Sequence, residues 1–146
     1  MANELLKTDL KLTMRDFDRM ASDRDFVDLK ATFRGDLETV GDRNNLAQAI
    51  INRLLTRRGE LTHFGHPNYG SRLYLLIGEL NNVKQRAKAE LYIRECLAQE
   101  SRIELVKEVS FAKANRQEDR DTLRVLIRVK PIGGSDEFSI VIPLDI

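Results

Sequence analysis

Two histidines, His63 and His66, stand three residues apart in the segment ELTHFGHPNYG, which covers residues 60–70. Imidazole nitrogens at this spacing can share a metal ion if a loop turns both rings inward, but a metal site needs at least one further ligand. The single cysteine, Cys96, falls in a different predicted element and has no partner at metal-binding spacing. We therefore expect ordinary loop histidines, with no metal site and no cofactor.

Acidic residues are the other candidates for chemistry, because two carboxylates about 5 to 9.5 Å apart can hydrolyse a glycosidic bond. Glu60, Glu79 and the Asp residues near the N-terminus could supply such a pair. The chain has 23 Asp and Glu residues, however, so close pairs are expected by chance, and no spacing selects one of them. A Ser-His-Asp signature and a glycine-rich phosphate loop are also missing. We expect no catalytic residue.

Length, charge and hydropathy limit the possible partners. At 146 residues the chain has room for one domain with a substantial core. A net charge of +1 does not provide the excess of Lys and Arg that nucleic-acid binding needs. There is no stretch of about 18 apolar residues and no signal-peptide pattern. Neither nucleic acid nor a membrane is expected as a partner, and the lone cysteine fits assembly in a reducing cytoplasm.

A mostly buried helix is predicted over residues 45–58, because apolar residues recur at a spacing of four. Asn44 or Asn45 can cap its first turn, and Gly59 can end it in the left-handed conformation. The apolar positions are Leu46, Ile50 and Leu54, and a narrow polar stripe runs through Gln48 and Asn52.

Two further helices are predicted. Residues 71–77 have the pattern of a short helix capped by Ser71 and stopped by Gly78, and residues 82–99 begin with Asn82 and Gln85 at capping-box spacing. The expected buried stripe of this third helix consists of Val83, Ala87 and Leu91, flanked by Ile93 and Leu97.

The segment between the first two helices must be an irregular loop, because residues 60–70 contain two glycines and a proline. Glu60 follows two arginines, so a partly buried ion pair could clamp the loop, and breaking such a pair would cost about 3 to 5 kcal/mol. An exposed Glu60, worth at most about 1 kcal/mol, is an equally good interpretation. We call the following residues the fold-organising loop: Arg57, Arg58, Gly59, Glu60, Pro67, Tyr69 and Gly70.

After Ser101 the apolar period changes to two, which predicts three strands joined by polar turns at residues 114–120 and 131–135. A meander is the simplest connection. The fold class is therefore α+β, with three helices followed by a C-terminal three-stranded antiparallel sheet. The positions expected on one face are Ile103, Leu105, Val109 and Phe111, then Leu123, Val125, Ile127 and Val129, then Phe138, Ile140, Ile142 and Leu144.

The last predicted strand, FSIVIPLDI, carries almost no charge, which is unusual for an exposed sheet edge. Either the edge is covered within its own sheet or a second polypeptide adds a strand to it. In a generic domain internal cover is the better interpretation, because proteins commonly protect their sheet edges.

The N-terminal part is expected to differ from the rest. Residues 1–35 are rich in charge and are predicted to form an arm or lead-in, in which MRDFDRMASDRDF is a polar loop or a short frayed helix. Residues 36–146 form the predicted α+β domain, and residues 36–40 a short strand at its start.

The string NLAQAIINRLLTRRGELTHFGHPNYGSRL, residues 45–73, resembles the small baseplate-wedge proteins of contractile phage tails and contractile injection systems, a family often labelled tail-lysozyme-like. The resemblance is carried by three pieces in this order and spacing: Asn45-Leu46-x-Gln48-x-Ile50, Leu54-Leu55-Thr56-x-x-Gly59-Glu60 and Pro67-x-Tyr69-Gly70-Ser71-x-Leu73. It covers residues 36–146 and leaves residues 1–35 without an assigned role.

The resemblance implies a structural component of a phage tail or injection particle, assembled in the cytoplasm. Such proteins join the helical core of a baseplate wedge, contact the larger wedge subunits and offer C-terminal strands to the first ring of the sheath protein. It places Gln48, Asn52 and Arg53 on the wedge-core helix and makes Phe138, Ile140, Ile142 and Leu144 the sheath-docking strand. It also raises the odds that the last strand has an open edge.

Two alternatives remain open at this level. A peptidoglycan-cleaving enzyme is suggested by the family label and by the number of acids, although no catalytic pair can be matched residue by residue. A stand-alone adaptor without any particle is the other alternative. Residues 1–35 could contact a tail tube, a spike hub or nothing.

Overall fold

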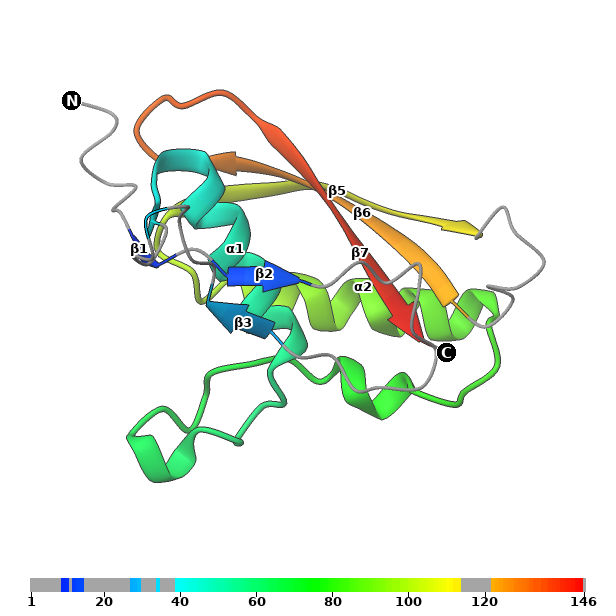
Figure 1. The fold of residues 1–146 in the computed structure, drawn as a ribbon. Helices are drawn as coiled ribbons and strands as arrows, with labels where there is room; N and C mark the ends of the chain where they lie inside the picture. The colour runs from blue at the N-terminus through cyan, green and yellow to red at the C-terminus, as the bar shows by residue number, and fades with distance from the viewer. Residues whose placement is uncertain are drawn as a thin grey trace.

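The computed structural model describes residues 9–10, 12–14, 27–29, 34, 39–113 and 122–145. Its main body contains two α-helices and a three-stranded antiparallel sheet with the strand order β5-β6-β7 (Figure 1). The predicted α+β class and the C-terminal antiparallel sheet are confirmed. The elements of the body are α1 (Asp42–Leu55), α2 (Val83–Leu97), β5 (Ile103–Lys113), β6 (Thr122–Pro131) and β7 (Phe138–Asp145).

Short strands near the N-terminus form two additional small sheets. β1 (Asp9–Leu10) pairs antiparallel with β4 (Thr39–Val40), and β2 (Leu12–Met14) pairs antiparallel with β3 (Val27–Leu29). Parts of residues 1–35 are thus paired strands, which the predicted arm did not include. The strand predicted over residues 36–40 is present as β4. The rest of the arm, including the polar loop after Met14, and the turn predicted at residues 114–120 lie outside the described residues.

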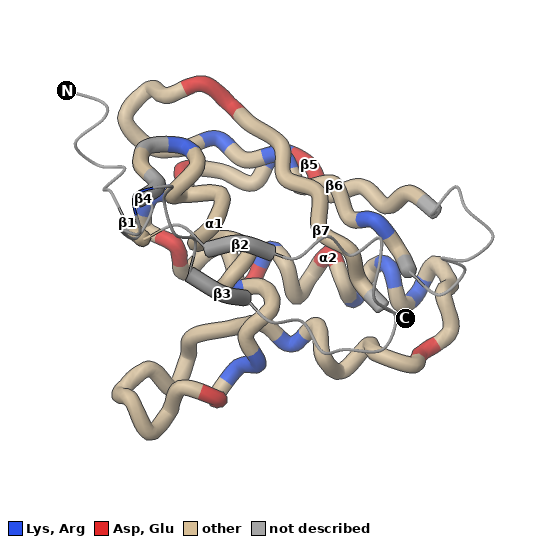
Figure 2. The backbone as a smooth tube through the Cα atoms, in the orientation of Figure 1, with Lys and Arg blue, Asp and Glu red and all other residues tan. Residues whose placement is uncertain are grey.

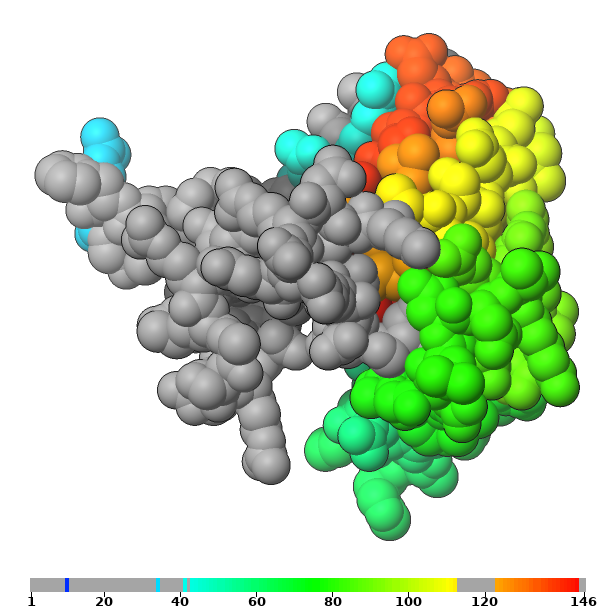
Figure 3. Space-filling view, turned by 90° about the vertical axis from the view of Figure 1, so that its right-hand side faces the viewer, coloured from blue at the N-terminus to red at the C-terminus, as the bar shows by residue number. Residues whose placement is uncertain are grey.

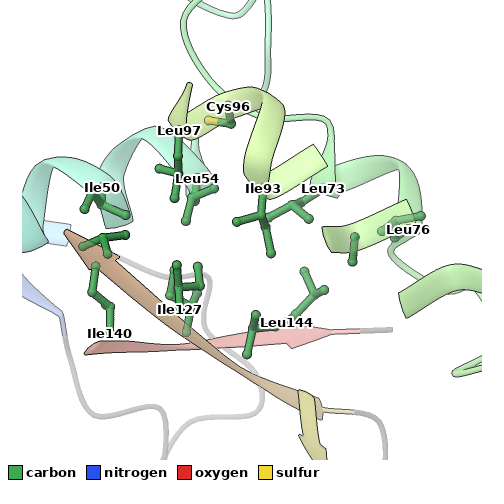
Figure 4. Packing of buried hydrophobic residues seen from close by; sticks show 14 of the residues in the cluster. Ile50, Leu54, Leu73, Leu76, Ile93, Cys96, Leu97, Ile127, Ile140 and Leu144 are labelled. Atoms are coloured by element: carbon green, nitrogen blue, oxygen red, sulfur yellow. The ribbon is translucent and has the colours of Figure 1, made fainter. Parts of the chain in front are cut away.

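The hydrophobic core lies between the two helices and one face of the sheet (Figure 4). The predicted spacing of four in α1 is confirmed, because Leu46, Ile50 and Leu54 are each at most 2% exposed. The sheet contributes residues of a single parity, as a strand period of two requires. From β6 and β7 these buried residues are Leu123, Val125, Ile127, Val129, Ile140, Ile142 and Leu144, with Phe138 partly buried beside them.

The prediction for β5 is wrong at Leu105, which is 50% exposed. The pairing of β5 with β6 shifts register between Ile103 and Leu105 and again between Val106 and Glu108. Each such irregularity changes which side chains face the core. Val106 therefore packs against the core in place of Leu105.

The predicted limits of the first helix are also wrong. α1 begins after Gly41, and no side chain caps its first turn. It ends at Leu55 because Thr56 is already extended, with φ −76° and ψ 134°. Gly59 does adopt a positive φ of 90°, but it does so within the following loop and does not end the helix.

The second predicted helix is a short 3-10 turn, η3 (Leu73–Leu76), so the described residues form two α-helices where three were predicted. The Ser71 hydroxyl accepts a hydrogen bond from the Leu73 N–H at 3.2 Å and donates one to the Leu54 carbonyl at 2.6 Å. The same side chain thus starts the turn and satisfies a carbonyl at the end of α1. Gly78 lies two residues after the end of η3, and its positive φ of 81° is incompatible with a continued right-handed helix.

The start of α2 is confirmed, because the Asn82 side chain accepts a hydrogen bond from the Gln85 N–H at 2.9 Å. Its predicted buried stripe is wrong. The buried residues of α2 are Ala89, Ile93, Cys96 and Leu97, whereas Val83 is 84% exposed and Leu91 is 62% exposed. The core therefore uses a neighbouring face of the helix. Of the predicted residues, only Ile93 and Leu97 lie on that face.

Candidate interaction surfaces

The fold-organising loop leaves the body at the end of α1 and returns to it at Ser71. At its base the Arg58 N–H donates to the Ser71 carbonyl and the Ser71 N–H donates to the Thr56 carbonyl, each at 2.9 Å. These bonds form an isolated parallel bridge between Arg57 and Ser71. Figures 1 and 3 show the chain between these anchors projecting away from the body.

Gly70 allows this bridge to form. It is buried, its φ is 101°, and a Cβ atom added there would lie 2.6 Å from the Thr56 carbonyl oxygen and 2.8 Å from the Arg57 carbonyl carbon. Both contacts are to backbone atoms, which cannot move aside without opening the bridge. The loop base therefore requires glycine at this position for two independent reasons, the positive φ and the close approach.

Glu60 is exposed, and its carboxylate accepts a hydrogen bond from the Arg57 backbone N–H at 3.1 Å. The Glu60 N–H in turn donates to the Arg57 carbonyl at 3.0 Å. Within the described part of the chain Glu60 makes no ion pair with a guanidinium group, so the partly buried clamp considered for it is not observed. Its contact with the loop is a local backbone one.

Arg58 and Arg72, near the two ends of the fold-organising loop, are bound by an acid on α2. Arg58 Nη1 lies 2.7 Å from Glu95 Oε1, and Arg72 Nη2 lies 3.5 Å from the same oxygen. Arg57 is exposed, with its guanidinium carbon 5.6 Å from the centre of the Tyr74 ring. Glu95 thus joins both ends of the loop to α2. No local pattern in the sequence connects these residues, and the prediction did not include Glu95.

A second ionic cluster fixes Arg53, one of the predicted wedge-core residues. Arg53 Nη2 lies 3.7 Å from Glu100 Oε2, and these side chains are 15% and 9% exposed. Glu100 also receives two hydrogen bonds from the Arg102 guanidinium, at 2.8 Å and 3.2 Å. Burial alone would raise the pKa of Glu100, but its hydrogen bonds with Arg102 and the two positive charges outweigh burial and lower the pKa.

The other two predicted wedge-core residues also make contacts within the chain. Gln48 Nε2 donates to the Leu10 carbonyl in β1 at 2.8 Å, which joins α1 to an N-terminal strand. The Asn52 carbonyl accepts from both the N–H and the hydroxyl of Thr56, at 3.0 Å and 2.7 Å. These hydrogen bonds help to position Gln48 and Asn52. Their contact with a partner stays a prediction.

His63 and His66 are exposed on the projecting part of the loop, close to Pro67, which is exposed as well. Across the ranges that the structure describes, no three His, Cys, Asp or Glu side chains lie close enough together to hold a metal ion. Cys96 is buried, which raises the pKa of its thiol to about 11. Within the described residues, the projecting part of the loop therefore presents exposed polar and apolar side chains.

The predicted sheath-docking strand lies at an edge of the sheet. β7 pairs with β6 from Phe138 opposite Val129 to Asp145 opposite Thr122, and among the described residues no strand pairs with its other edge. The side chains predicted to dock point into the core or lie against it, since Ile140, Ile142 and Leu144 are buried. Those side chains therefore hold β7 in place, and the outer edge of β7 has no strand partner within the described residues.

The sequence pattern of contractile injection system sheath initiators matches residues 19–131, which is most of the chain. The chain belongs to the sheath initiator family. A sheath initiator is a structural component of a contractile injection system or phage tail particle, in agreement with the resemblance found in the sequence. No curated protein matches the chain closely enough to refine this assignment.

The fold of this sheath initiator is found among solved structures. One is the crystal structure of a protein from Geobacter sulfurreducens described as a candidate tail lysozyme, which is 23% identical in sequence and has a TM-score of 0.59. The match covers 70% of this chain and 88% of that one. At this identity the likeness concerns the fold alone. In the described part of the sheath initiator, no helix has the length and apolar character needed to cross a membrane.

Proposed function

We propose that this sheath initiator is a non-enzymatic part of the baseplate wedge and starts the sheath by accepting a strand of the sheath protein at the outer edge of β7. One observation carries the proposal: β7 is bonded to β6 on one side and, in the described residues, to no strand on the other. Such an edge provides a row of amide and carbonyl groups that a foreign strand can complete.

The composition of the two edge strands favours β7 over β5 as the docking edge. β5 includes the charged residues Glu104, Lys107 and Glu108 and contains two register shifts, and both features discourage pairing with another chain. From Phe138 to Leu144, β7 has no charged residue and pairs with β6 in unbroken register. Of the two edge strands of this described sheet, β7 alone therefore combines a regular backbone with an edge that lacks protective charges.

Pro143 indicates how the backbone of β7 is oriented. Within a sheet, proline is found chiefly where its nitrogen faces away from the hydrogen-bonded neighbour, because it has no N–H to donate. Pro143 lies opposite Arg124 of β6 inside the paired stretch, so its nitrogen is expected to face the outer edge. Successive residues alternate in direction, and Val141 and Ser139 then direct their N–H groups outward as well.

A proline at Val141 tests the proposal. Val141→Pro removes an outward N–H from the centre of the edge, while Val141→Thr keeps the N–H and the β-branched shape. Both variants should enter baseplates, but only Val141→Thr should support sheath polymerisation, scored by electron microscopy of particles. Equal melting temperatures would show that Val141→Pro retains the β6–β7 ladder. Normal sheath on a folded Val141→Pro protein would contradict the proposal.

We infer that the helices and the fold-organising loop attach the protein to the wedge. We propose that α1 and α2 face the larger wedge subunits, that assembly takes place in the cytoplasm, and that Gln48, Asn52 and Arg53 support this contact. The loop is suited to such a role, because hydrogen bonds fix its base while its tip projects, with Phe64 77% exposed. For residues 1–35 we propose a contact with a tail tube or a spike hub.

The charged groups do not support peptidoglycan cleavage. A glycosidase needs a carboxylic acid whose pKa is raised, so that it can donate a proton near neutral pH. Glu100, the buried acid among the described residues, has a lowered pKa and is bonded to Arg102. A turbidity assay on cell walls with concentrated protein should therefore show no clearing.

A further inference from the structure

We propose that a second apolar stripe on α2 binds an amphipathic helix of another particle protein, and that this helix carries Asp or Glu beside its apolar positions. We call the stripe the outer face of α2; it is formed by Val83, Ala87 and Leu91 and is extended by Leu80, which precedes the helix. The inference deepens the proposed function by naming the chemistry of the partner, and it relies on that function only for the partner's location in the particle.

The outer face of α2 is unusually exposed for apolar side chains. Leu80, Val83 and Leu91 are 80%, 84% and 62% exposed, and Ala87 between them is exposed as well. Val83, Ala87 and Leu91 recur at a spacing of four, so they form one stripe along the helix. Figure 3 shows the segment that carries them, in green, at the surface of the molecule below β5, in yellow.

The fold of the domain does not use this stripe. α2 already packs against the core through Ala89, Ile93, Cys96 and Leu97, which lie on a different side of the helix. A surface helix normally has one apolar face and polar residues elsewhere. A helix with two apolar faces is therefore expected to have a second partner, and contiguous exposed apolar surface commonly marks a protein contact.

The charges beside the stripe define the partner. Lys84 and Lys88 lie on one side of it, both are exposed, and neither makes an ion pair with another described residue. Figure 2 shows both signs of charge along the main body, with Lys and Arg in blue and Asp and Glu in red. On the other side, Glu90 pairs with Arg94 at 2.9 Å, so its negative charge is already compensated. Along the helical part of the stripe, from Val83 to Leu91, the charge without an ion partner among the described residues is positive. A complementary partner carries carboxylates opposite Lys84 and Lys88.

The geometry favours a helix as the partner, because apolar residues at spacings of three and four fit the groove pattern of another helix. A second copy of this chain, packed antiparallel through the same stripe, is a poorer occupant. In an antiparallel pair of two α2 helices related by two-fold symmetry, each flank meets its own counterpart, so the lysines of both copies would face one another.

The test uses the full-length protein in assembling particles. Lys84→Glu combined with Lys88→Glu reverses the charge beside the stripe, and Lys84→Arg combined with Lys88→Arg is the matched control that keeps it. Both positions are exposed, so melting temperatures should not change in either variant. Incorporation into baseplates should fall at least about tenfold for the glutamate pair and stay at the wild-type level for the arginine pair. A photo-cross-linking residue at Leu91 should link to an acidic amphipathic helix of a different protein.

Each contrary result overturns the inference. These results are wild-type incorporation of the glutamate pair, a cross-link from position 91 to a second copy of the chain, and a cross-link to a segment without acids beside its apolar positions. Assembly of particles with no cross-link at all would also overturn it. The strand proposal fails separately: Val141→Pro is expected in baseplates that lack sheath, so sheath growth on that variant contradicts strand docking alone.

Discussion

The guanidinium carbon of Arg53 lies 4.5 Å from the centre of the Tyr69 ring. Arg53 belongs to α1, and Tyr69 immediately precedes Gly70 at the base of the fold-organising loop. The same guanidinium group lies 3.7 Å from the carboxylate of Glu100, which follows α2. One arginine thus connects α1, the loop and the end of α2, so the position of the loop depends on the packing of both helices.

Replacing Tyr69 tests this connection. Tyr69→Leu removes the aromatic face under a partly desolvated guanidinium group and should lower the free energy of unfolding by about 1 kcal/mol. Tyr69→Phe keeps the ring and serves as the matched control, with a smaller expected loss. Urea denaturation followed by circular dichroism measures both. Equal losses for the two variants would show that the cation–π contact does not stabilise the loop.

Gly70→Ala should be among the most damaging single substitutions in the loop. The added Cβ atom would lie 2.6 Å from the Thr56 carbonyl oxygen at a φ of 101°, so the bridge at the loop base must open, at a cost of about 3 kcal/mol or more. Gly65→Ala is the control, because Gly65 has a similar φ of 83° but no atom within 4 Å of the added group. It should cost about 1 to 2 kcal/mol. Similar melting temperatures for the two variants would refute the close-approach argument.

Glu100→Gln should destabilise the protein in a pH-dependent way. The substitution leaves Arg53 and Arg102 without their shared carboxylate and should cost about 2 to 3 kcal/mol at pH 7, somewhat less than breaking a fully buried pair. Glu104→Gln, at a surface pair with Lys130 at 3.1 Å, should cost less than about 1 kcal/mol. Urea denaturation across a series of pH values provides both the size and the pH dependence.

The sign of that pH dependence follows from the lowered pKa of Glu100. In the unfolded chain a glutamate has a pKa of about 4.3, so on acidification the unfolded state binds the proton first. The stabilisation is complete above the unfolded pKa and is lost as the pH falls through the folded pKa. The difference between wild type and Glu100→Gln should therefore be constant near neutral pH and shrink in acid. A difference that grows in acid would contradict the lowered pKa.

Local patterns in the sequence were sufficient for the elements that have a single apolar face. Leu46, Ile50 and Leu54 predicted the buried side of α1, and the alternation in β6 and β7 predicted which side chains line the core. Asn82 predicted the start of α2, because a capping bond involves residues only three apart. The family motif in residues 45–73 could also be recognised from the sequence alone.

Long-range contacts decided the remainder. The sequence of α2 contains two apolar stripes, and only packing against α1 and the sheet selects the one with Ile93 and Leu97 for the core. In the same way, the register shifts in β5 place Val106 inward, and Glu95 and Glu100 meet arginines that lie far away in the chain. Neighbouring residues determine periods and caps because they interact over one or two turns. The choice between equivalent faces and the pairing of distant charges depends on which elements the folded chain brings together.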